Sequence, residues 1–243
     1  MVFNAQSNLR FRRALPHVFT AGNLFCGLLG MVFLLSEHRM ALAAACMGVA
    51  LFLDVFDGLV ARLLGVDGDF GKQLDSLADV VSFGALPSAF AWELLLRWET
   101  ATGNSVGAWR YLTLLLAVFA ALRLAKFNLD PGQKTHFIGL PTPAMAAFFG
   151  GWGMAVDSGA TVLWHHPIIV LIATGFMCFL MIAPLPLFSL KRSPGKPFSP
   201  GIGILLGLGL FGVWFLHWWT LPLVVVLYPL ISLAIFRPAA DAV

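Results

Sequence analysis

Residues 40–79 read MALAAACMGVALFLDVFDGLVARLLGVDGDFGKQLDSLAD, so a long apolar run leads into a dense group of aspartates. Six of the chain's 12 acidic residues lie in this group: Asp54, Asp57, Asp67, Asp69, Asp75 and Asp79. Asp54 and Asp57 lie within the apolar run itself. An aspartate at the middle of a membrane helix costs roughly 2.5–3.5 kcal/mol, so these carboxylates need a compensating partner.

The composition of the chain is typical of a membrane protein. Of its 243 residues, 59% are hydrophobic and only 11% are charged, whereas soluble domains carry about 25% charged residues. Cys26, Cys46 and Cys178 all lie in apolar runs, and we predict no disulfide among them. The net charge of +3 is small, and we expect no nucleic-acid partner.

The apolar segments predict eight membrane spans, because roughly 20 mainly apolar residues form a helix that crosses a bilayer. They are residues 18–36, 40–64, 73–97, 108–127, 142–157, 166–187, 201–217 and 220–236. The last two are short and could form a re-entrant pair, so six or seven spans are the alternatives. We therefore predict an all-α polytopic membrane helix bundle, with residues 1–243 as a single membrane-embedded domain.

The positions of lysine and arginine predict the orientation of the bundle. With eight alternating spans, 12 of the 15 basic residues fall on the side of the N-terminus, and only Arg39, Arg97 and Arg110 fall on the other. The positive-inside rule then places both termini in the cytoplasm. Residues 1–17 form a basic juxtamembrane segment, for which a helix on the membrane surface and a short tail are both open.

Helical periodicity predicts that the aspartates of each span share one face. The stripe on the second span consists of Asp54, Asp57, Gly58, Ala61 and Arg62, and that on the third span of Gly71, Asp75, Ala78, Asp79 and Ser82. A short loop joins the two spans and makes them antiparallel neighbours. Four carboxylates, Asp54, Asp57, Asp75 and Asp79, can therefore face one another near the cytoplasmic end, while Asp67 and Asp69 are expected in the loop.

The residue types in this cluster predict a metal site. All ligands are oxygen atoms, which favours Mg²⁺ or Mn²⁺, with Ca²⁺ as an alternative, over zinc. Four carboxylates suit two ions better than one. The small residues beside them and Arg62 would admit and bind a diphosphate. From the spacing alone, a cation or proton pathway remains the alternative.

The stretch from Asp54 to Asp79 resembles the signature of the CDP-alcohol phosphotransferases, D-x2-D-G-x2-A-R-x8-G-x3-D-x3-D, at all eight fixed positions. The resemblance implies that Asp54 and Asp75 bridge two divalent cations. It implies that Asp57 completes one metal site and Asp79 the other, with Asp79 also the general base. In the family pattern, Gly58, Arg62 and Gly68, together with Thr20 and Asn23 of the first span, would bind CDP-diacylglycerol.

Two further stretches resemble the bacterial phosphatidylserine synthases of this family. They are Pro16–Gly27 (PHVFTAGNLFCG) and Arg123–Ala144 (RLAKFNLDPGQKTHFIGLPTPA); the family commonly has arginine where this chain has Lys126. The resemblance implies transfer of a phosphatidyl group from CDP-diacylglycerol to L-serine, with Arg123, Lys126 and Asn128 at the serine. Glycerol phosphate, inositol phosphate and choline are alternative acceptors. It also implies a homodimer among membrane lipids, in the bacterial inner membrane, with a cytoplasmic active site.

Overall fold

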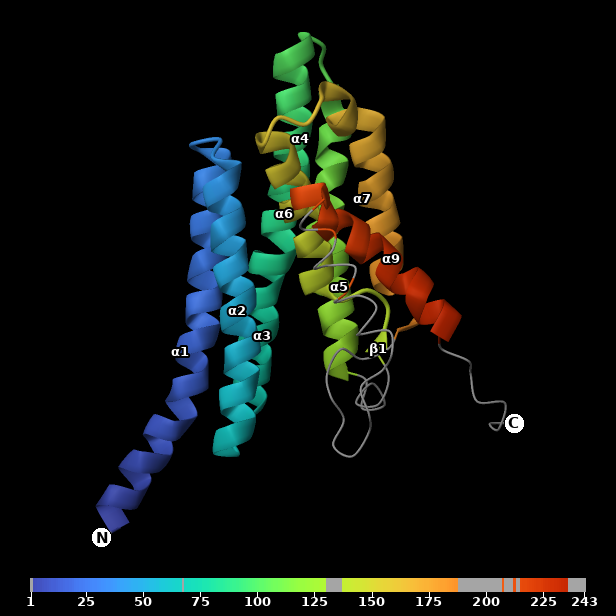
Figure 1. The fold of residues 1–243 in the computed structure, drawn as a ribbon. Coiled ribbons are helices and arrows are strands. Elements are labelled where there is room, and N and C mark those ends of the chain that lie inside the picture. The colour runs from blue at the N-terminus through green and yellow to red at the C-terminus, as the bar shows by residue number, and fades with distance from the viewer. Residues whose placement is uncertain are drawn as a thin grey trace.

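The computed structural model describes residues 2–66, 68–129, 137–187 and 215–235, together with Gly207 and Gly212. Helices α1 (Val2–Leu35) and α2 (Met40–Leu64) pack along each other as an antiparallel hairpin (Figure 1). The backbone of α1 is helical from Val2, so most of the segment 1–17 continues without a break into the first span. Within α1, Ala14–Leu35 is long and apolar enough to cross a membrane.

The third helical rod is longer than the sequence predicts. It consists of α3 (Asp69–Val80), a π-helical turn η1 (Val81–Ala85) and α4 (Leu86–Thr102), and it runs from Asp69 to Thr102 where a span of 73–97 was expected. Asp69 is therefore the first residue of a helix rather than part of the loop, and its negative charge suits the positive end of the helix dipole. Asp67 lies outside the described residues.

The short loop before α3 depends on Gly65. This residue has a left-handed backbone with φ of 62°, and its N–H donates to the carbonyl of Arg62 at 3.3 Å. A glycine in this conformation commonly ends a helix, because it lacks the side chain that would be strained there. Helix α2 thus ends at Leu64, and four residues separate it from the start of α3 at Asp69.

The remaining elements are shorter. They are η2 (Gly107–Leu114), α5 (Leu115–Leu129), α6 (Thr142–Asp157), η4 (Val162–His165), α7 (Pro167–Ile182), η5 (His217–Trp219) and α9 (Thr220–Ile235). The predicted span 166–187 is too long, since α7 ends at Ile182 and Pro186–Leu187 forms strand β2, antiparallel to β1 (Phe137–Ile138). Most of the predicted span 201–217 lies outside the described residues.

Within the described residues, five of the eight predicted spans correspond to helices of membrane-spanning length. Among the described residues, five helices are long and apolar enough to cross a membrane: Ala14–Leu35, Met40–Leu64, Asp69–Thr102, Gly107–Leu129 and His217–Ala234. Helices α6 and α7 each have 16 residues, fewer than the roughly 20 that a span needs. The all-α class is confirmed, with one pair of two-residue strands.

Helix α6 lies at the centre of the bundle, and its glycines bring the neighbours close. A Cβ atom added at Gly150 would lie 3.0 Å from Met47 of α2, and one added at Gly151 would lie 2.6 Å from Leu221 of α9. At Gly153 it would lie 2.5 Å from the ring of Phe90 of α4. Small residues permit such close approach where helices pack in membranes. Each glycine thus admits a different helix.

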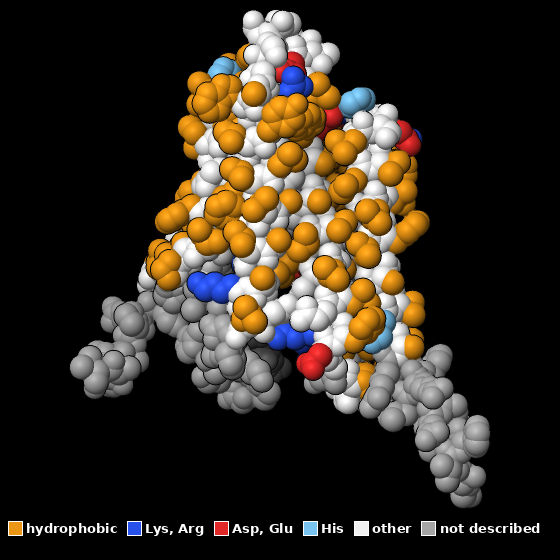
Figure 2. Space-filling view, turned by 180° about the vertical axis from the view of Figure 1, so that it is seen from behind, with side chains coloured by type: hydrophobic (Ala, Val, Ile, Leu, Met, Phe, Trp, Pro, Cys, Tyr) orange, Lys and Arg blue, Asp and Glu red, His pale blue; other side chains and the backbone are white. Residues whose placement is uncertain are grey.

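Charge and apolar surface are separated along the bundle. In Figure 2, hydrophobic side chains cover the middle of the visible face, and charged side chains gather at its two ends. Arg39, Arg97 and Arg110 belong to the end that carries the α1–α2 turn, whereas Arg62 and Lys72 belong to the opposite end. An apolar belt between charged ends matches the hydrocarbon core of a bilayer. The protein is a multi-pass membrane protein.

The orientation can be tested with single cysteines in a variant without Cys26, Cys46 and Cys178. Gly68 is exposed and has an extended backbone, so any residue fits there; Asn104 is exposed at the other end. We expect that Asn104→Cys reacts with a membrane-impermeant thiol reagent in intact cells and that Gly68→Cys reacts only after the cells are opened. The reverse pattern would invert the topology.

Candidate metal and substrate site

Helices α2 and α3 bring three of the predicted carboxylates together. Asp54 and Asp57 of α2 and Asp75 of α3 each offer one oxygen, and these atoms all lie within 4.8 Å of one another. Asp57 is buried, and the other two are half-buried. The two stripes predicted from helical periodicity therefore do meet.

Asp79 lies one helical turn beyond Asp75 and is not part of this group of three. Its carboxylate is buried and still interacts electrostatically with Asp54, Asp75 and Asp57. The side-chain amide of Asn23 donates to Asp79 Oδ1 at 3.4 Å. Asp79 thus sits at the edge of the cluster, with its position set partly by α1.

Helix α1 supplies hydrogen-bond donors to the aspartates. Thr20 Oγ1 donates to Asp57 Oδ2 at 2.7 Å, and Asn23 contacts Asp79 as described. The resemblance placed Thr20 and Asn23 beside the nucleotide. In the structure, both side chains are buried and hold carboxylates of the aspartate cluster. Hydrogen bonds of this kind orient ligand groups and limit their movement.

The close approach of α1 to the third rod depends on Gly27 and Ser82. A Cβ atom at Gly27 would lie only 2.9 Å from the Cα atom of Ser82, and Ser82 Oγ donates to the carbonyl of Asn23 at 3.0 Å. Ser82 belongs to the π-helical turn that begins two residues after Asp79. Such turns occur frequently at functional sites, and the spacing of residues gave no signal for this one.

The other residues predicted to bind CDP-diacylglycerol lie on an open side of the cluster. Within the described part of the chain, and apart from the local backbone, a Cβ atom added at Gly58 would meet only Arg62 Nη1, at 3.7 Å, and one added at Gly68 would meet nothing within 4 Å. The side chain of Arg62 is exposed on the last turn of α2. The signature glycine Gly71 is different, since its Cβ position would lie 2.9 Å from the ring of His17.

Arg123, one of the three residues predicted at the serine, is buried and interacts with the cluster. Arg123 is only 9% exposed, and it interacts electrostatically with Asp79 and with Tyr228 of α9. Its Nε atom is buried and has no hydrogen-bond partner among the described residues. Sequence reasoning missed Tyr228, although a buried tyrosine in an apolar helix needs a polar neighbour and could have drawn notice.

Lys126 and Asn128 occupy different surroundings. Lys126 is exposed on α5 and forms no ion pair within the described part of the chain. The amide of Asn128 donates to Ser76 Oγ at 2.7 Å, and the Asn128 carbonyl accepts from Lys72 Nζ at 3.2 Å. Asn128 therefore joins the end of α5 to α3, directly beside Asp75.

The chemistry of the cluster fits a divalent cation. Its donors are carboxylate oxygens, which are the preferred ligands of Mg²⁺, Mn²⁺ and Ca²⁺. Three carboxylates this close, between helices of a membrane bundle, would repel one another without positive charge between them. Asp54, Asp57 and Asp75 can hold such an ion, and Asp79 is near enough to extend the site.

A comparison with protein families identifies the family of the chain. The family described as CDP-alcohol phosphatidyltransferase matches residues 13–226, which include all the aspartates of the cluster and Arg123. The chain belongs to this family.

Several relatives in this family carry related names. The chain is 33% identical over 187 residues to a CDP-diacylglycerol–serine O-phosphatidyltransferase of Bacillus subtilis, an alignment that covers 77% of this chain and 97% of the relative. It is 37% identical over 133 residues to the Helicobacter pylori protein of the same name, covering 54% of this chain and 53% of that relative. An archaetidylserine synthase of Methanothermobacter thermautotrophicus is 33% identical over 142 residues, covering 55% and 54% of the two chains.

The contact at Gly27 generates a prediction about stability. Gly27→Ala should destabilise the protein by about 1–3 kcal/mol, since its Cβ atom would press on the backbone of Ser82 and push α1 away from Asp79. Gly48→Ala on α2 is the control, because the added Cβ would meet no atom of another described element within 4 Å. Thermal unfolding in detergent should show a lower midpoint for Gly27→Ala only. Equal midpoints for the two variants would contradict the close helix contact.

Proposed function

We propose that this protein transfers the phosphatidyl group of CDP-diacylglycerol to L-serine and releases CMP. The family identifies an enzyme rather than a transporter, and relatives at 33–38% identity carry the name of this activity. The observation that carries the proposal is that buried Arg123 interacts electrostatically with Asp79, at the edge of a carboxylate cluster suited to metal ions. A phosphate-binding and a carboxylate-binding group thus lie next to each other.

In the proposed reaction, the serine hydroxyl oxygen forms a bond to the phosphorus that carries the diacylglycerol. The bond from that phosphorus to the bridging oxygen breaks, and CMP leaves with the electron pair. Asp79 takes the hydroxyl proton, since its carboxylate lies at the edge of the cluster and is held by Asn23. Divalent cations bound at Asp54, Asp57 and Asp75 would stabilise the charge of the diphosphate and of the departing CMP.

Arg123 gives a physical reason for serine as the acceptor. Serine carries a carboxylate, and a guanidinium can bind both carboxylate oxygens at once. The buried Nε atom of Arg123 is available for such a contact. Arg62 and Gly58, on the open side of the cluster, are the proposed contacts of the CDP group, together with Gly68 at the start of α3. Thr20 and Asn23 act on the CDP group through the aspartates they hold.

We place the site at the cytoplasmic face of a bacterial inner membrane, where CDP-diacylglycerol lies in the bilayer and serine arrives from solution. Two ions, Mg²⁺ or Mn²⁺, are proposed for the cluster. The homodimer that the family resemblance implies stays a prediction, which the mass of the purified protein in detergent would test.

The proposed reaction can be tested by CMP release from CDP-diacylglycerol with different acceptors. We expect release with serine and little with glycerol phosphate, inositol phosphate or choline. Chelation of divalent cations should abolish it. Asp54→Asn and Asp75→Asn should each lower it about 100-fold or more, because metal ligands contribute several kcal/mol to such reactions. Full activity in EDTA would contradict the metal site, and a preference for glycerol phosphate would contradict the acceptor.

Arg123 can be tested through the serine dependence of the rate. Arg123→Lys should raise the serine KM about ten-fold or more, since a charge-assisted contact contributes about 1.5–3 kcal/mol, while the KM for CDP-diacylglycerol stays nearly unchanged. Lys126→Ala is the matched control and should have little effect, because Lys126 is exposed. If Arg123→Lys instead weakens donor binding alone, Arg123 belongs to the diphosphate or lipid side.

A further inference from the structure

The turn between α1 and α2 contains a strained residue. His38 has a φ of 54°, a left-handed conformation that costs energy for residues other than glycine. Strain of this kind persists only where surrounding contacts maintain it. The turn lies at the opposite end of the bundle from the carboxylate cluster (Figure 1).

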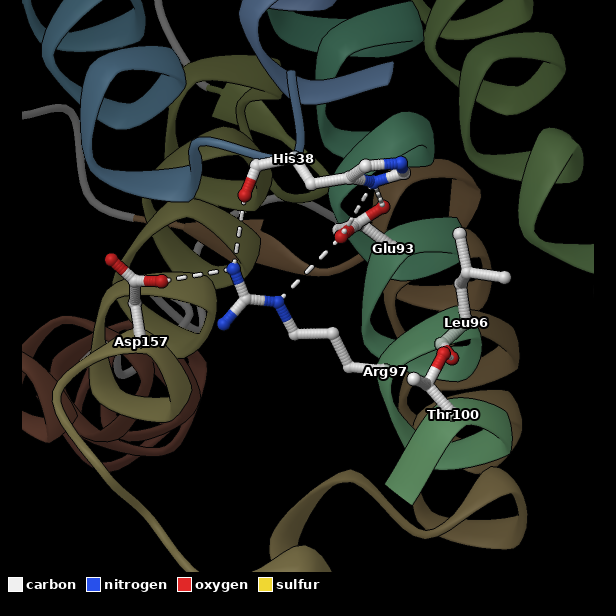
Figure 3. A network of polar contacts seen from close by, with 6 residues as sticks. All are labelled: His38, Glu93, Leu96, Arg97, Thr100 and Asp157. Carbon is white, nitrogen blue, oxygen red and sulfur yellow. Dashed lines mark hydrogen bonds and ion pairs between the residues drawn. The ribbon is translucent and has the colours of Figure 1, made fainter. Parts of the chain in front are cut away.

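Two residues of α4 hold His38 in place (Figure 3). His38 Nδ1 lies 3.1 and 3.2 Å from the two carboxylate oxygens of Glu93, a side chain that is only 2% exposed. Arg97 Nη2 donates to the backbone carbonyl of His38 at 3.1 Å. Both the side chain and the backbone of the strained residue are therefore fixed on the third rod.

Arg97 extends this network to a third element. Its guanidinium lies 2.9 Å from Asp157, the last residue of α6, and 3.6 Å from Glu93 (Figure 3). A cavity of about 780 Å³ is lined by His38, Glu93 and Arg97 of this network, and also by His165. Burial, and then Arg97, lower the pKa of His165, so this ring stays neutral and adds no charge. One arginine thus joins the α1–α2 turn, α4 and α6.

The α1–α2 hairpin and the third rod each carry half of the candidate metal site, at the end of the bundle opposite His38. Asp54 and Asp57 lie on α2, whereas Asp75 and Asp79 lie on α3. From Met40 to Asp57, α2 rises about 26 Å at 1.5 Å per residue. A tilt of about 3° at the turn would therefore move Asp57 by more than 1 Å. A misplacement of about 1 Å can lower a rate about 100-fold.

We propose that His38, Glu93 and Arg97 are positioning residues for the metal site at the far end of the bundle. Their contacts set the height and tilt of the α1–α2 hairpin against the third rod, and so the separation of Asp54 and Asp57 from Asp75. The inference rests on the metal site of the proposed function. Apolar contacts also hold the hairpin to the bundle. Buried Met40 of α2 lies against Gly153 of α6, where an added Cβ atom would be 3.5 Å from the Met40 sulfur.

The test measures Mn²⁺ affinity of the purified full-length protein, from the electron paramagnetic resonance signal of free Mn²⁺, alongside CMP release. His38→Ala and Arg97→Gln should weaken Mn²⁺ binding about five- to ten-fold and lower kcat at least about ten-fold. The serine KM should change less than about two-fold, because Arg123 lies on α5. His38→Asn should restore both values, since asparagine tolerates the left-handed conformation and its amide can donate to Glu93.

Arg110→Gln is the matched control. Arg110 pairs with Glu99 at 3.4 Å, and its side chain is 29% exposed, against 30% for Arg97. It lies at the same end of the bundle and should leave Mn²⁺ affinity unchanged. Wild-type affinity in His38→Ala and Arg97→Gln, or losses that His38→Asn does not restore, would overturn the positioning role. A wild type that binds no Mn²⁺ would instead overturn the metal site itself.

Discussion

Three carboxylates with oxygens within 4.8 Å of one another, between helices of a membrane bundle, are the constraint on which this structure depends. Their mutual repulsion grows as water is removed, so the helices that carry them must be held together by other contacts. Helix α1 provides two of these contacts through Thr20 and Asn23. A divalent cation would provide the remaining attraction, and the phosphates of a CDP-linked lipid would bind on its open side.

The rest of the bundle serves to keep α2 and α3 in register. Helix α6 is too short for a regular span, but it is buried along most of its length, and its three glycines admit α2, α4 and α9. The contacts of Arg97 with His38 and Asp157 join the α1–α2 turn to α4 and α6. Van der Waals packing holds helices together in a membrane, and directional polar contacts such as those of Arg97 add a preferred geometry.

The three residues predicted at the serine do not form one group in the structure. Arg123, Lys126 and Asn128 belong to one short string, but the structure separates them. Arg123 is buried beside Asp79, Lys126 is exposed, and Asn128 binds Ser76. Arg123 and Asn128 stand five positions apart and point to different sides of the helix. Lys126 follows Arg123 by about one turn and is already exposed, so one string need not form one binding site. Tyr228, from the far end of the chain and outside this string, interacts electrostatically with Arg123.

The sequence by itself determined the all-α class, the aspartate stripes on α2 and α3, the bounds of α6 and the family signature. These features depend on composition and on spacings within a helical turn or two, which are local. Only the tertiary structure decided that Thr20 and Asn23 hold aspartates 37 and 56 residues away, and that His38 is fixed by Glu93 across 55 residues. It also decided the full length of the rod Asp69–Thr102 and the early end of α7. Such contacts follow from which helices become neighbours, and helical periodicity carries no information about a helix's partners.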